Sequence, residues 1–256
     1  MGWDILSWSY SVVRKDLKLL LFPVMSVGGA GLAALLFLQF RLFYGLNYAA
    51  LFLWYVAATF LMVFFNCALA ACALAHFAGR PASLGYGLGQ AAARVSNIFL
   101  WALLSSTVGI LIRMIDRRLS LAGKIAVWLF GAAWGMATFL VVPILVVEDM
   151  GPVEALKRSA EMLRKSWGDQ LTARIRLGWF GLLLFAPALL LGIAGAFRAP
   201  LFWAAAIVYG GLVAAFITAS QGVFQAAMYR QLTTGQAPAG LADVLGYRTA
   251  PRFDGR

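Results

Sequence analysis

Six long apolar runs dominate this sequence, and each is long enough to cross a lipid bilayer as a helix, which takes about 20 residues. They cover residues 19–39, 49–75, 97–115, 125–147, 177–197 and 201–228. None alternates apolar with polar residues as a strand of a membrane barrel does, and a backbone in lipid must satisfy its own hydrogen bonds. The chain is therefore predicted to be an all-α integral membrane protein with six transmembrane helices.

The positions of Lys and Arg predict the orientation, because positive charge near a span is retained in the cytoplasm. With a cytoplasmic N-terminus, 15 of the 21 basic residues fall on the inner side and 6 on the outer side. We expect both termini to be cytoplasmic and the protein to be a multi-pass protein of the cell membrane. The cluster of Arg113, Arg117, Arg118 and Lys124 is then an outer loop near lipid phosphates.

The net charge of +11 could indicate nucleic acid, but the basic residues lie mostly between apolar runs rather than in one domain. Contact with anionic lipid headgroups explains them more simply. The expected partners are therefore membrane lipids, with a homo-oligomer or other membrane proteins as further partners, and no nucleic acid.

Three similar junctions predict an internal repeat. The matching triplets are Gly79, Pro81 and Leu84, then Gly151, Pro152 and Leu156, then Gly235, Pro238 and Leu241. Proline suits the first turn of a helix, so each junction predicts a helix start. The unit is a cytoplasmic amphipathic helix followed by two spans. It is used three times in one membrane domain (1–78, 79–150 and 151–228), and a polar cytoplasmic tail follows (229–256).

The segment after the middle junction has the strongest amphipathic pattern. Its predicted apolar face carries Val153, Leu156, Ala160, Leu163 and Trp167. The opposite face is charged, and it includes four candidate contacts for lipid headgroups: Lys157, Arg158, Arg164 and Lys165. A basic amphipathic helix binds an anionic surface through apolar burial and charge.

This junction also carries a resemblance to known families, through Pro143, Glu148, Gly151, Ala155, Leu156, Arg158 and Ser159. It resembles an uncharacterised family of six-span prokaryotic membrane proteins. It is similar, more distantly, to the membrane domain fused to some glycerophosphodiester phosphodiesterases. Neither resemblance supplies a known catalytic residue. With one histidine, two cysteines and acids almost confined to loops, we expect no metal site, catalytic triad, phosphate-binding loop or cofactor.

Adjacent acids at the inner end of the fourth run, Glu148 and Asp149, are candidate site residues. Acids at a membrane boundary are often functional, so a proton or cation site is one interpretation. The favoured interpretation is that they pair with Lys157, Arg158 or the basic ends of neighbouring helices.

Four polar residues inside the spans form a second candidate set, because a polar group in lipid is costly. Asn66, Thr138, Gln221 and Gln225 lie 15, 14, 17 and 13 residues before a junction proline, at a similar expected depth. They either line a polar patch or hydrogen-bond between helices. The leading hypothesis is a non-enzymatic membrane scaffold that organises lipids or partner proteins. The alternative is a transporter or channel with a cytoplasm-facing vestibule lined by these four residues.

Overall fold

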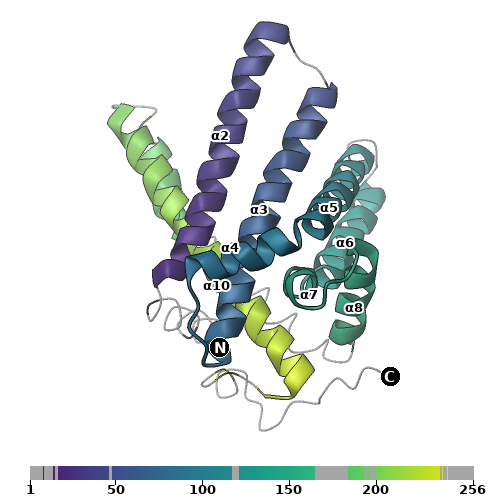
Figure 1. Ribbon diagram of the computed structural model, residues 1–256. Coiled ribbons are helices and arrows are strands. Elements are labelled where there is room, and N and C mark those ends of the chain that lie inside the picture. The colour runs from purple at the N-terminus through teal and green to yellow at the C-terminus, as the bar shows by residue number, and fades with distance from the viewer. Residues whose placement is uncertain are drawn as a thin grey trace.

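The computed structural model describes residues 8, 14, 17–45, 48–116, 121–164, 184–193, 195, 200–236, 238 and 241. Within these ranges every regular element is a helix (Figure 1). The elements are η1 (Leu17–Leu20), α2 (Leu21–Tyr44), α3 (Tyr48–Phe77), α4 (Leu84–Ala93), α5 (Val95–Asp116), α6 (Leu121–Ala137), α7 (Val141–Val147), α8 (Pro152–Arg164) and α10 (Pro200–Thr234). The all-helical prediction is confirmed.

Five stretches are long and apolar enough to cross a membrane: Leu21–Leu42, Tyr48–Phe77, Val95–Ile115, Gly123–Val147 and Leu201–Thr234. They correspond to five of the six expected runs. The remaining run, 177–197, is described only in part, and that part contains a shorter apolar helix, Leu184–Ile193. The sixth span therefore stays a prediction.

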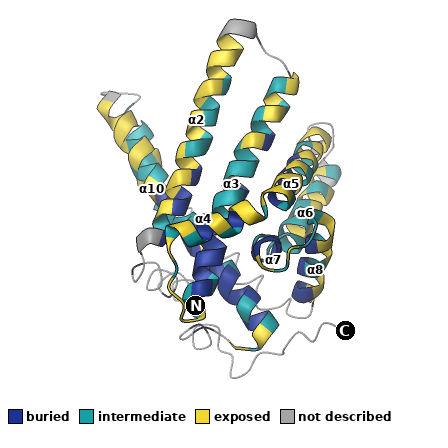
Figure 2. Cartoon of the chain, in the orientation of Figure 1, coloured by how far each residue is buried: buried dark blue, intermediate teal, exposed yellow. Residues whose placement is uncertain are grey.

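Burial divides the described chain into a packed base and splayed arms (Figure 2). The base consists of α4, α7 and α8 with the C-terminal halves of α3 and α10, where most of the fully buried side chains lie. The arms are α2, α5, α6 and the N-terminal halves of α3 and α10. They expose large apolar side chains, among them Leu32, Leu36, Leu53, Trp128, Leu129, Leu201 and Ile207. Lipid tails are as apolar as these side chains, so a bilayer accepts them where water would not. This surface is that of a membrane protein.

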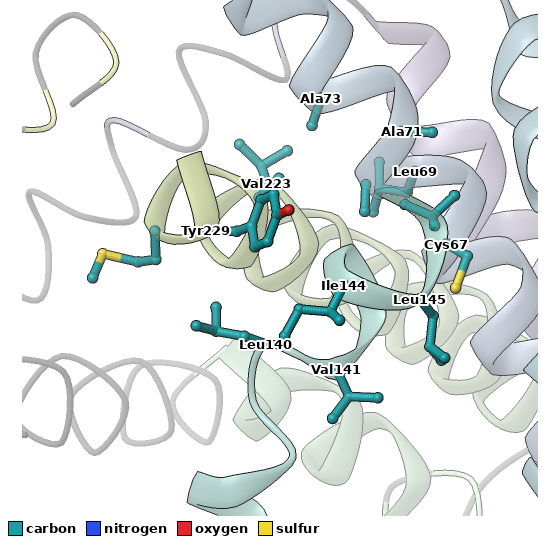
Figure 3. Close-up of a cluster of buried hydrophobic side chains, with 14 of the residues drawn as sticks. Cys67, Leu69, Ala71, Ala73, Leu140, Val141, Ile144, Leu145, Val223 and Tyr229 are labelled. Atoms are coloured by element: carbon teal, nitrogen blue, oxygen red, sulfur yellow. The ribbon is translucent and has the colours of Figure 1, made fainter. Parts of the chain in front are cut away.

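The core of the base forms where α3, α7 and α10 meet, and these helices precede the three junctions (Figure 3). The Cys67 thiol on α3 donates to the Val142 carbonyl on α7 across 3.7 Å. Gly222 of α10 lies so close to α3 that an added Cβ would sit 2.5 Å from a methyl carbon of Leu69. The three segments are far apart in the sequence, yet they share one core.

The run expected to be a single span at 125–147 is broken in the structure. It consists of α6 and α7 with a turn at residues 138–140 between them. Pro143 explains the break, because its ring clashes with the carbonyl of residue i−4, Phe139, and it has no N–H to donate. The base compensates at this point, since the Leu140 N–H donates to the hydroxyl of Ser159 on α8 at 3.1 Å.

The junctions share a backbone feature, which at the middle junction lies two residues before the glycine that the sequence comparison aligned. Gly79 and Gly235 lie just beyond α3 and α10 with φ of 70° and 72°, in the left-handed conformation that often ends a helix. At the middle junction this place belongs to Asp149, with φ of 51°, and not to Gly151. Asp tolerates this region better than most residues with a Cβ.

The expected helix starts are right at one of the two fully described junctions. Helix α8 begins at Pro152, as predicted. Helix α4 begins at Leu84 rather than at Pro81, because Ser83 is its N-cap and accepts a hydrogen bond from the Tyr86 N–H at 3.1 Å. At the far end of the chain, α10 continues six residues past the expected end of its run at 228, to Thr234.

Candidate functional site

Glu148 joins three parts of the base. It follows α7, and its carboxylate accepts one hydrogen bond from the Tyr229 hydroxyl of α10 at 2.9 Å and another from Arg158 Nε of α8 at 3.2 Å. The Glu148 side chain is only 15% exposed, so the ion pair with Arg158 is largely shielded from water. Both carboxylate oxygens have a protein partner. Figure 3 shows Tyr229 between α10 and α7, near Ile144.

Asp149 faces a different arginine. One of its oxygens lies 3.0 Å from Arg94 Nη1, and the other accepts a hydrogen bond from the Asn97 side-chain amide at 3.3 Å. Its side chain is 54% exposed, so water screens this pair far more than the Glu148 pair. Both adjacent acids thus have basic partners, one of the two arrangements expected from the sequence. Within the described ranges, no three His, Cys, Asp or Glu side chains gather as a metal would require.

The buried face of helix α8 matches the predicted one only in part, since Leu163 is buried and Leu156 and Ala160 are half-buried. The buried residues are Ala155, Ser159, Met162 and Leu163, whereas Val153 is 53% exposed. The pattern was misread because alanine and serine are short enough to approach α6 and α7 closely, although a hydropathy pattern does not mark them as core.

The four candidate headgroup contacts on this helix have different surroundings. Lys157 and Arg164 are exposed, while Arg158 is held by Glu148. Lys165 and Trp167 lie outside the described residues. Two of the four basic side chains are thus exposed, and their contact with headgroups stays a prediction.

The four polar residues of the proposed patch are all described, and no hydrogen bond of the described residues joins one of them to another. The Thr138 hydroxyl donates to the Trp134 carbonyl, four residues earlier in the chain, at 2.9 Å. Gln221 is exposed, and Asn66 and Gln225 are half-buried. None of the four is among the residues that line a pocket between α3, α4, α7 and α10, which is described next. Thr138 therefore has a local structural role at the break between α6 and α7.

A pocket of about 480 Å³ opens on the base between α3, α4, α7 and α10, and the sequence did not reveal it. Its lining includes Arg80, Arg94 and Arg230 together with apolar residues such as Leu74 and Val146. The sequence places these arginines on the same side of the membrane but in separate segments. Their only shared signal is that Arg80, Arg94 and Arg230 all lie near junctions, which is too general to predict a pocket.

Comparisons with known proteins give a family match. The search of curated proteins and that of solved structures each found no match. A sequence profile of a family of unknown function matches residues 45–239, from the C-cap of α2 onward. This confirms the expected likeness to an uncharacterised family, whereas the more distant likeness to the phosphodiesterase membrane domain stays a prediction. By this match over most of its length, the chain belongs to the family of unknown function DUF6159.

Proposed function

We propose that this chain is a non-enzymatic scaffold that organises anionic lipids at the cytoplasmic face of the cell membrane. The observation that carries the proposal is the distribution of charge on the base. Glu148 and Asp149 are each occupied by an arginine of the base itself. Arg80, Lys157 and Arg164 are exposed and form no ion pair within the described ranges.

This arrangement leaves the base with positive charge available to other molecules. Basic residues near a membrane surface attract anionic lipids by about 1 kcal/mol each, within a Debye length of that surface. The arms place the base at one end of the apolar helices, where headgroups would surround it (Figure 2). A base with its acids already paired is therefore suited to collect anionic headgroups.

The proposal includes six spans arranged as three repeats, with both termini in the cytoplasm. It is supported by the meeting of α3, α7 and α10 and by the left-handed residue that follows each of these helices. A repeated hairpin that ends in the base would place three interfacial segments around one core. Such a platform could also assemble with a second copy or with other membrane proteins.

The test is the composition of the lipids that remain bound to the full-length protein after mild detergent extraction. The proposal expects a higher fraction of anionic lipid in the bound pool than in the source membrane. The triple variant Arg80→Gln, Lys157→Gln and Arg164→Gln should lower that fraction. A bound pool that matches the membrane for both proteins would reject the proposal.

A further inference from the structure

We propose that the pocket bounded by Arg80, Arg94 and Arg230 is a binding site for one phosphate group, presented by a lipid headgroup or by free phosphate. The inference deepens the lipid-organising role, and it rests on that role for the source of the phosphate. The pocket combines positive charge, unused donors and an apolar wall at one place on the base. Each of these features contributes separately to the argument.

The charge of the pocket is positive because the nearby acids are occupied. Both oxygens of Glu148 are bound, by Tyr229 and Arg158, and neither partner is one of the three pocket arginines. Asp149 pairs with one of the three, Arg94. Arg80 and Arg230 form no ion pair with any residue that the structure describes. Two guanidinium groups are therefore left for an anion.

Donors inside the pocket also lack acceptors. Arg230 Nη1 and Arg94 Nε are buried from water and have no hydrogen-bond partner among the described residues. A buried donor without a partner costs free energy, so such groups in proteins nearly always have one. Phosphate oxygens match the planar fork of a guanidinium group, and the resulting charge-assisted hydrogen bonds are among the strongest in proteins.

Two neutral groups on α4 extend the set of donors. The Tyr86 hydroxyl and the Gln90 amide line the same pocket, and neither side chain hydrogen-bonds to another described residue. Both can donate to a phosphate or to the glycerol oxygens next to it. Tyr86 and Gln90 are four residues apart and so face the same side of α4.

The apolar wall favours a ligand larger than a bare ion. It comes from α3 and α7, through Ala71, Leu74, Ala75, Val146 and neighbouring residues. A volume of about 480 Å³ is within the usual range for small-molecule sites. The arginine side can hold the phosphate while the wall contacts a glycerol or the start of an acyl chain. A phosphomonoester lipid matches both sides.

The experiment is calorimetric titration of the full-length protein in detergent micelles. The probes are dihexanoyl phosphatidic acid, dihexanoyl phosphatidylcholine and inorganic phosphate. The pocket variant is Arg80→Gln with Arg230→Gln. The matched control, Lys157→Gln with Arg164→Gln, removes the same charge from the exposed face of α8. Because Arg80 is exposed, the single variant Arg80→Gln keeps the test valid if the double variant does not fold.

The inference predicts that phosphatidic acid binds more tightly than phosphatidylcholine. Each pocket substitution should weaken that binding by about tenfold, the loss expected for a charged hydrogen bond. The α8 control should change it much less. Free phosphate that binds as well as the lipid, with the same loss in the pocket variant, would support the site but count against the lipid role.

Two results would overturn the inference. Equal weakening by the pocket and control variants would replace the site with a diffuse surface charge and leave the lipid-organising role intact. Absence of binding to any of the three probes by the folded wild-type protein would reject both proposals.

Discussion

The Leu140 N–H donates to the Ser159 hydroxyl at 3.1 Å, and this hydrogen bond ties the broken span to helix α8. Ser159 is fully buried, and Leu140 is the last residue of the turn that Pro143 imposes and the N-cap of α7. A buried N–H without a partner is costly, so the break between α6 and α7 depends on a side chain from a later element. The middle junction is therefore one unit in which Pro143 and Ser159 act together.

Ser159→Ala should destabilise the protein by about 1–3 kcal/mol, the cost of leaving a buried donor unpaired. The matched control is Ser220→Ala. Ser220 is equally buried, but its hydroxyl donates to the Phe216 carbonyl of its own helix. We expect a much smaller loss for the control, measured as the free energy of unfolding in mixed micelles. Equal losses for the two variants would contradict the role given to Ser159.

The two adjacent acids should differ in their contribution to stability. Glu148→Gln leaves the charged Arg158 beside a neutral amide in a shielded site. We expect the free energy of unfolding to fall by about 2–3 kcal/mol. That is below the ~3–5 kcal/mol of a fully buried pair because Arg158 retains 26% exposure. Asp149→Asn should cost at most about 1 kcal/mol, since that pair is screened and Asn also tolerates the left-handed backbone. The same unfolding assay compares the two variants. A larger loss of stability for Asp149→Asn would contradict the ranking of the Glu148 pair above the Asp149 pair.

Glycines on α4 provide a second matched pair. A Cβ at Gly87 would lie 2.6 Å from the Cys72 sulfur and 2.7 Å from the Ala68 carbonyl oxygen, so Gly87→Ala should cost about 1–3 kcal/mol by overpacking. A Cβ at Gly89 meets nothing within 4 Å, and Gly89→Ala should stabilise the helix by about 0.5–1 kcal/mol. Thermal unfolding of the two variants measures the difference. A stable Gly87→Ala variant would show that α4 does not pack so closely on α3.

Orientation can be tested with single cysteines at exposed positions. Cys67 and Cys72 are buried, so they give little background with a membrane-impermeant thiol reagent. Lys157→Cys should react only after the cytoplasmic side is opened, whereas Lys124→Cys should react in intact cells. The reverse pattern would place the base outside the cell and contradict the proposed orientation.

The scaffold proposal also makes a prediction about transport. Liposomes that contain the folded protein should pass ions and small solutes no faster than protein-free liposomes. Replacing Asn66, Gln221 and Gln225 with Leu should then change nothing in a flux assay. Flux that is present in the wild type and lost in this variant would favour the transporter hypothesis.

The sequence predicted the features that depend on composition and period. Runs of apolar residues correctly located five helices that are long and apolar enough to cross a bilayer, because length and hydropathy are local properties of the sequence. The start of α8 at Pro152 was also predictable, since proline at the first turn loses no hydrogen bond. These are local properties of the chain.

Features that depend on contacts between distant residues were missed. The break after Ala137 needs Ser159 as an acceptor, and the close approach of α4 needs Gly87 beside Cys72. Glycine disfavours the interior of a helix, yet Gly87 is what lets α4 pack so closely on α3. The arginines of the pocket are 14 and 136 residues apart in the sequence, so only the fold brings them together. No local pattern encodes such pairings.

The central claim is that the base selects anionic lipid, and spin-labelled lipids in reconstituted membranes test it most directly. Electron paramagnetic resonance measures the fraction of each lipid that is immobilised on the protein. The account predicts that phosphatidylglycerol is immobilised more than phosphatidylcholine and that raised salt reduces the difference, since exposed charges are screened. Equal immobilisation of the two lipids at low salt would contradict it.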